Sequence, residues 1–102
     1  MSKYVFAYRG GSMGETPEEQ EASMNAWMAW FGSLGAAVKD VGNPFVASTT
    51  LAPGGTRGST SAGLTGYSIV EADSIDEAAT FASSCPLLSS GGTLEIYEAM
   101  PM

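Results

Sequence analysis

The side chains that could do chemistry in this sequence are eleven carboxylates, four tyrosines, two arginines and one cysteine. Histidine is absent from the sequence. Ser-His-Asp and Cys-His catalysis are therefore excluded, and the usual general base near neutral pH is missing. The single Cys85 forms no internal disulfide, and without histidine a zinc site is not expected. Any general base must be a carboxylate or a tyrosine whose pKa is shifted by burial.

Four of the eleven carboxylates occupy positions that suit helix capping rather than catalysis. Glu18, Glu19, Asp76 and Glu77 lie in the first turns of two expected helices, where hydrogen bonds keep carboxylates ionised. The remaining candidate bases are Asp40, Glu71, Glu95 and Glu98, and none has a partner at a recognisable spacing. We therefore assign no catalytic residue, no metal ligand and no cofactor.

Residues 8–20, YRGGSMGETPEEQ, have the layout of a phosphate-binding loop, because an apolar strand pattern precedes three glycines and a helix start. The spacing G-G-x-x-G differs from the dinucleotide pattern G-x-G-x-x-G. Four glutamates between residues 15 and 21 also crowd the positive end of the helix dipole that a phosphate would need. We interpret this segment as a glycine turn into a self-capped helix.

A ligand-binding cleft between the first helix and the sheet is the candidate site. Two positions leave alternatives open: Trp30 lies about 80° from the centre of the apolar helix stripe and suits a core edge or a cleft rim. Arg9 suits either a carboxylate ligand or a surface ion pair. Trp27 lies at the centre of the stripe, which also favours a core position. The candidate cleft residues are Tyr8, Arg9, Met24, Trp27, Trp30, Asp40 and Asn43.

Composition limits the class of protein. The chain has 102 residues and is expected to be one domain, residues 1–102. A formal net charge of −7 opposes binding to a nucleic-acid backbone, which needs clustered cations. The first residues lack a signal-peptide pattern, and no apolar run reaches membrane-spanning length. We expect a soluble cytoplasmic protein that binds neither nucleic acid nor membrane.

The periodicity of apolar residues predicts four strands and two helices. The first helix has Thr16 as its N-cap and an apolar stripe of Met24, Trp27, Met28, Phe31, Leu34 and Val38. Ser74 caps the second helix, which Pro86 should end, and the glycine-rich residues 52–66 should form a flexible connection. The expected elements are strand 3–9, helix 17–34, strand 45–51, strand 66–73, helix from residue 75, and strand 91–100.

The order strand-helix-strand, strand-helix-strand predicts an α+β ferredoxin-like βαββαβ sandwich. Its four-stranded antiparallel sheet would carry both helices on one face. The other face would expose either Tyr4, Phe6 and Tyr8 or Val5 and Ala7. Because both sets are apolar, a second copy of the chain is the expected cover, giving a homodimer through the open sheet face.

Three stretches taken in order resemble the YCII-related domains of the DGPF type: KYVFAYRGG, PEEQEASMNAWMAWFGSLGAAVKDVGNPF, and GYSIVEADSIDEAATFASSCPLLSSGGTLEIYEAMPM. This resemblance spans nearly the whole chain. It implies a subunit of the dimeric α/β-barrel kind, in which two sheets pack face to face.

The sequence departs from that family at two places. The Asp-Gly-Pro-Phe segment is replaced by GGTRGSTSAGLTG between the second and third strands. The histidine that some members carry in the first helix, paired with an aspartate, is also missing, and the matching stretch offers Met24. Any chemistry of that pair is therefore excluded.

Function at this level rests on the expected cleft. The leading hypothesis is a non-catalytic small-molecule-binding or regulatory homodimer. The alternative is a small enzyme that acts on an aromatic or lactone-like metabolite without histidine or metal. A third hypothesis is an interaction subunit with no ligand. A true pocket containing a buried group of shifted pKa would favour the enzyme.

Overall fold

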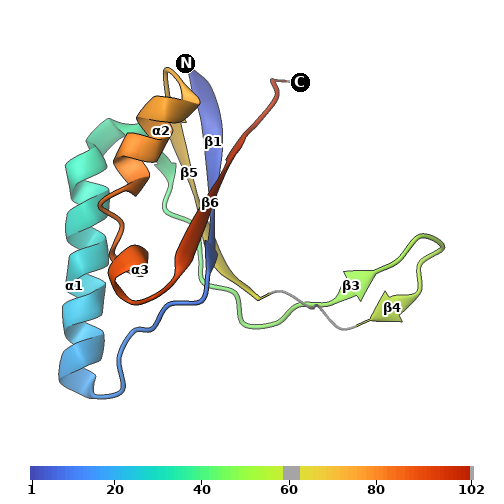
Figure 1. Ribbon diagram of the computed structural model, residues 1–102, viewed down its shortest axis with the longest axis horizontal. Coiled ribbons are helices and arrows are strands. Elements are labelled where there is room, and N and C mark those ends of the chain that lie inside the picture. The colour runs from blue at the N-terminus through green and yellow to red at the C-terminus, as the bar shows by residue number, and fades with distance from the viewer. Residues whose placement is uncertain (59–62, 102) are drawn as a thin grey trace.

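The computed structural model describes residues 1–58 and 63–101 (Figure 1). The central sheet consists of β1 (Ser2–Arg9), β2 (Val38–Asp40), β5 (Leu64–Ala72) and β6 (Thr93–Glu98). Two further strands, β3 (Thr50–Leu51) and β4 (Arg57–Gly58), pair only with each other. The helices are α1 (Pro17–Leu34), the 3₁₀ turn η1 (Gly35–Ala37), α2 (Ile75–Ala82) and α3 (Pro86–Ser89).

The central sheet has the order β2-β5-β1-β6, and every pair of neighbouring strands is antiparallel. Helices α1, α2 and α3 lie on one side of this sheet, and its other side carries no helix (Figure 1). The α+β class and the four-stranded antiparallel sheet are confirmed, and the strand order is that of a ferredoxin-like βαββαβ sandwich.

Both long helices begin at the residues that the sequence predicts. The Thr16 hydroxyl accepts a hydrogen bond from the Glu19 N–H at 3.1 Å, and Ser74 accepts from the Glu77 N–H at the same distance. Each glutamate also turns back, so that Glu19 accepts from Glu15 N–H and Glu77 from Asp73 N–H, both at 2.9 Å. These bonds satisfy N–H groups that a helix start leaves without a partner.

The core lies between the sheet and the helices. From β1 it takes Tyr4, Phe6 and Tyr8, and from β5 it takes Val70 and Ala72. Helix α1 contributes Trp30, which is 4% exposed and stacks on Phe6 with ring centroids 6.2 Å apart. The remaining buried members are Ala78, Ala82, Cys85 and Leu87. The Trp30 indole N–H donates to the Phe81 carbonyl at 2.9 Å, so one side chain joins α1 to α2.

The position of the second strand was predicted incorrectly. It follows η1 directly as Val38–Asp40 and pairs with β5, and an isolated bridge from Pro44 to Gly66 extends the contact. Of the predicted residues 45–51, only Thr50–Leu51 is a strand, and it pairs with Arg57–Gly58. Thr50–Leu51 pairs with Arg57–Gly58 rather than with the central sheet because that partner is nearer in the chain. The turn at Gly54 and Gly55, both with positive φ, folds residues 50–58 back on themselves.

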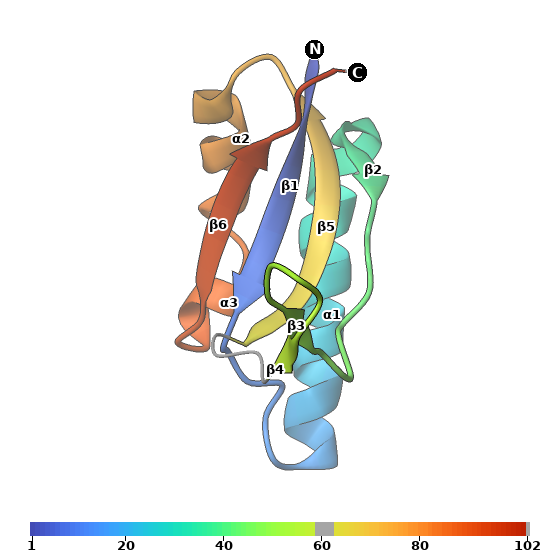
Figure 2. The same cartoon turned by 90° about the vertical axis from the view of Figure 1, so that its right-hand side faces the viewer.

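This β3–β4 hairpin projects from the open side of the sheet (Figures 1 and 2). The predicted flexible connection of residues 52–66 therefore contains a hairpin strand and the beginning of β5. Residues 59–62 of that prediction lie outside the described residues. The structure does not test how mobile the connection is.

The end of the second helix also differs from expectation. Helix α2 ends at Ala82, three residues before the turn residue Cys85, and Pro86 opens the short helix α3. Proline is tolerated in the first turn of a helix because its missing N–H would have no partner there. The Ser83 N–H already bonds back to Ala79 and Thr80, which closes α2 before the proline is reached.

Gly42 provides a stability test for the packing of the β2–β3 loop against β5. A Cβ there would collide with the Tyr67 carbonyl oxygen, and φ is +75°. We expect Gly42→Ala to lower the free energy of unfolding by about 3 kcal/mol or more, from overpacking and backbone strain together. Gly54→Ala is the matched control: its φ is +92°, but a Cβ meets nothing within 4 Å, so about 1 kcal/mol of strain is expected. If urea unfolding shows equal losses of unfolding free energy for the two variants, the close contact between Gly42 and Tyr67 is contradicted.

Candidate functional site

A cavity of about 490 Å³ lies between α1 and the sheet, where β1 ends and β5 begins. Five chain segments form its wall: the end of β1 with the loop Gly10–Met13, the face of α1, the loop Val41–Pro44, Thr65–Tyr67 at the start of β5, and α3 with the residue that follows it. The residues outside these loops that line it are Tyr8, Met24, Trp27, Met28, Phe31, Leu87 and Ser90. A volume of this size suits a small organic molecule.

Glycine makes the floor of the cavity possible. Gly66 has the Asn43 carbonyl 3.2 Å and the Tyr8 ring 3.5 Å from the position that a Cβ would take. A side chain at Gly66 would therefore press on the Asn43 carbonyl of the loop and touch the Tyr8 ring. Asp40 shapes the same loop by accepting a hydrogen bond from the Gly42 N–H at 2.8 Å.

The deep wall of the cavity is aromatic. Trp27 meets the Tyr8 ring edge-on, with centroids 5.1 Å apart, and lies 6.0 Å from Phe31, one helical turn further along α1. Trp27 also contacts Trp30 edge-on at 5.7 Å. Edge-on and tilted aromatic contacts of this kind hold rings in fixed orientations. The half-buried Trp27 therefore presents a defined ring surface to the cavity.

Tyr8 is fixed by a buried hydrogen-bond chain. Its hydroxyl donates to Ser68 Oγ at 2.7 Å, and Ser68 Oγ donates to the Val41 carbonyl at 2.6 Å. Ser68 is fully buried, and burial also raises the pKa of Tyr8 well above its ordinary value. Tyr8 is therefore protonated at neutral pH. Its proton is committed to Ser68, and its oxygen can still accept a hydrogen bond.

The structure corrects the prediction for the face of α1. Trp30, placed off the stripe by the sequence, is in the core, whereas Trp27, placed at the stripe centre, is half-buried at the cavity. Met24 and Met28 are 57% and 69% exposed and line the cavity instead of filling the core. The helix is rotated about its axis because the Trp30 indole N–H has a part-buried acceptor at Phe81 O, which draws that edge toward α2.

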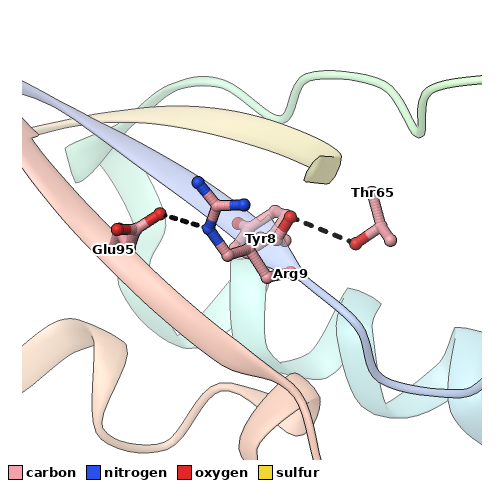
Figure 3. Close-up of polar contacts among 4 residues, drawn as sticks. All are labelled: Tyr8, Arg9, Thr65 and Glu95. Carbon is pink, nitrogen blue, oxygen red and sulfur yellow. Dashed lines mark hydrogen bonds and ion pairs between the residues drawn. The ribbon is translucent and has the colours of Figure 1, made fainter. Parts of the chain in front are cut away.

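Two more of the proposed cleft residues lie elsewhere. Arg9 is on the opposite face of the sheet, where its Nε lies 2.6 Å from Glu95 Oε1 (Figure 3). That hydrogen bond lowers the pKa of Glu95. Adjacent residues of a strand point to opposite faces, so Tyr8 inside places Arg9 outside. The open alternative for Arg9 is thus resolved as a surface ion pair, and the Asp40 carboxylate bonds its own loop.

Four of the seven proposed residues line the cavity: Tyr8, Met24, Trp27 and Asn43. Among the described residues, the Asn43 side chain has no hydrogen-bond partner, which leaves its amide available at the exposed loop. The sequence does not identify Gly10–Met13 as wall residues, because its glycines indicate only a turn that leads into the first helix. The N-terminus of α1 beside that loop is occupied by the Glu19 carboxylate.

The part of the chain that the structure describes holds no group of three or more histidine, cysteine, aspartate or glutamate side chains placed to bind a metal ion. No helix in residues 1–58 and 63–101 is both long and apolar enough to cross a membrane. Cys85 is buried beneath α3, and desolvation raises the pKa of its thiol to about 11. The thiol is therefore not an activated nucleophile near neutral pH.

No family model matches the sequence, and no curated protein matches it. Among solved structures, the fold is similar to 5-chloro-2-hydroxyhydroquinone dehydrochlorinase from Burkholderia phenoliruptrix AC1100, determined in complex with 2,5-dihydroxybenzoquinone. The TM-score is 0.57 and the sequence identity 21%, over 95% of this chain and 93% of that chain. This likeness supports the α+β fold over nearly the full length of both chains.

The raised thiol pKa predicts how stability depends on pH. The pKa of the Cys85 thiol is about 11 in the folded chain and about 9 in the unfolded chain. The contribution of this thiol to stability is therefore complete below pH 9. It is lost as the pH rises through 11, at up to about 1.4 kcal/mol per pH unit. Between pH 9 and 11 we expect the free energy of unfolding to fall more steeply in the wild type than in Cys85→Ala. If urea unfolding gives the same pH dependence of the unfolding free energy for the wild type and Cys85→Ala, the burial of this thiol is contradicted.

Proposed function

We propose that this protein is a small enzyme that acts on an aromatic metabolite held in the cavity beside α1, without histidine or metal. The observation that carries the proposal is the aromatic wall of Tyr8, Trp27 and Phe31 around a cavity of about 490 Å³. Flat aromatic compounds gain most from such edge and face contacts. The structural neighbour, named for its action on a chlorinated hydroxyhydroquinone and bound to a quinone, supports the same substrate class.

We also propose membership of the YCII-related domains within the dimeric α/β-barrel group. The supporting observations are the strand order β2-β5-β1-β6 and the helices gathered on one sheet face. The quoted sequence stretches support it as well. We infer the chemistry from the residues of this chain and not from the family.

The cavity supplies hydrogen bonds rather than a strong base. Tyr8 stays protonated because its pKa is raised. Thr65 Oγ1 donates to the Tyr8 carbonyl at 3.2 Å (Figure 3), and the Gly10 carbonyl, 3.3 Å away, shares the same proton. A phenolic substrate brings its own acidic hydroxyl, so a reaction here needs fixed groups around the ring oxygens more than a base. Tyr8 and Asn43 are the groups of this chain that we assign to those oxygens.

A second candidate function is binding without catalysis, as a small-molecule carrier or regulatory domain. The specific observation in its favour is that no carboxylate, lysine or arginine is among the residues that line the cavity in the described part of the chain. Incubation of the purified protein with hydroxylated aromatic compounds separates the two functions. Ligand binding without product formation supports the carrier, and turnover that Tyr8→Phe slows supports the enzyme.

Trp27 tests the site that both functions share. We expect Trp27→Ala to weaken binding of hydroquinone by about tenfold or more, because the variant removes the ring that faces the cavity. Isothermal titration calorimetry measures the loss. Ile75→Ala removes an exposed apolar side chain outside the cavity and should bind as the wild type does. If the two variants bind equally well, the aromatic ligand does not occupy this cavity.

We further propose that the chain forms a homodimer through the open sheet face. Strand alternation gives that face Val5, Ala7, Tyr67 and Ile69, and Tyr97 on β6 lies opposite Val5. Phe45 stacks on Tyr67 with ring centroids 5.7 Å apart, which widens the apolar area. The ion pairs Arg9–Glu95 and Lys39–Glu71 lie at its edges. An apolar centre with a charged rim is the usual anatomy of an interface.

The dimer should bury more than about 1,000 Å² in total, as stable assemblies do. We expect Ile69→Asp to produce a folded monomer, because it puts a charge at the centre of this face. Ile75→Asp is the control, since Ile75 is exposed on the helix side at the start of α2. Light scattering at micromolar concentration measures both. A wild-type monomer, or a dimer that survives Ile69→Asp, would overturn the proposed interface.

A further inference from the structure

We propose that the cavity selects uncharged phenols and rejects aromatic ligands that carry a carboxylate. This inference rests on the proposed function, which places an aromatic compound in the cavity, and it adds the charge and the polar groups of that compound. It also reverses the sequence interpretation in which Arg9 could receive a carboxylate.

The first observation is the neutrality of the cavity wall. None of the described residues that line it carries a formal charge. Residues 59–62, which lie outside the described range, are Ser, Thr, Ser and Ala and carry no charged side chain. A ligand carboxylate in this cavity would therefore lose water without gaining a cation. A buried, unpaired charge of that kind is strongly disfavoured.

The second observation is that the cations of the chain are used elsewhere. Arg9, on the opposite face of the sheet, and Lys39, on β2, do not line the cavity and pair with Glu95 and Glu71 at 2.6 and 3.6 Å. Arg57 is in the β3–β4 hairpin, where its Nε donates to Thr49 at 3.4 Å. Lys3, the fourth cation, is near the start of β1, at the opposite end from Tyr8. The net charge of −7 adds a general repulsion of anions.

The third observation concerns hydrogen bonds. Three hydroxyl groups of the wall already donate their protons within the chain: Tyr8 to Ser68, Thr65 to the Tyr8 carbonyl, and Ser90 to the Leu87 carbonyl. What these oxygens still offer is a lone pair. A ligand that donates a proton, such as a phenolic hydroxyl, therefore fits better than one that only accepts. The amide of Asn43 can serve either kind of oxygen.

The test compares two ligands that differ by one carboxylate, hydroquinone and 2,5-dihydroxybenzoate. Both are titrated under argon at pH 7.5 and fixed ionic strength, by calorimetry for every variant and also by tryptophan fluorescence for the wild type. We expect hydroquinone to bind at least about tenfold more tightly. Trp27→Ala is run beside the wild type, because binding that this variant abolishes takes place in the cavity.

A designed cation checks the cause of the selectivity. Met28→Lys places an ammonium group at an exposed wall position, and Ala29→Lys places the same group on the neighbouring exposed residue outside the wall. We expect Met28→Lys to narrow the preference for hydroquinone several-fold and Ala29→Lys to leave it unchanged. A preference that both lysine variants leave unchanged would overturn the inference.

The other outcomes distinguish a failure of the charge selection from a failure of the proposed aromatic binding site. If both compounds bind the wild type equally and Trp27→Ala abolishes both, the charge selection is wrong and the aromatic site stands. If 2,5-dihydroxybenzoate binds more tightly, the inference is likewise wrong. If neither compound binds, the proposed function fails and the charge selection fails with it.

Discussion

The antiparallel pairing of β1 with β5 is the constraint on which the rest of the structure depends. Its register sets Phe6 opposite Ser68, Tyr4 opposite Val70, and Tyr8 opposite Gly66. All of these residues point to the side that the helices cover, and a shift by one residue would turn every one of them outward. The core, the buried Tyr8–Ser68 hydrogen bond and the floor of the cavity are therefore consequences of one ladder of backbone hydrogen bonds.

The same register determines the charge of the site. Because Tyr8 points inward, Arg9 must point outward, where it pairs with Glu95 on the neighbouring strand. The cavity is left with hydroxyl, amide and aromatic groups. A hydroxyl whose pKa is raised by burial and whose proton is already donated is a positioning group, not a base. The proposed chemistry and the proposed selection of neutral ligands both follow from this arrangement.

Helix α1 shows how packing overrides a periodic pattern. Its apolar residues cover a wide arc, so periodicity allows several rotations about the helix axis. The part-buried hydrogen bond from Trp30 to Phe81 favours one of them, because an unsatisfied indole N–H on this 4%-exposed residue would be costly. Trp27, Met24 and Met28 are then left facing the cavity. The same rotation that completes the core thus produces the aromatic wall of the site.

The helix starts, three of the four sheet strands, the fold class and the lack of histidine chemistry are all predictable from the sequence. They depend on local capping bonds, on period-two alternation, and on composition. The second strand, the rotation of α1 and the set of residues that meet at the cavity depend instead on contacts between distant segments. The second strand was missed because Val38–Asp40 is too short to show a pattern, while residues 50–58 pair locally. The wall residues come from five segments distant in sequence, and only the sheet register and the packing of the helices on it bring them together.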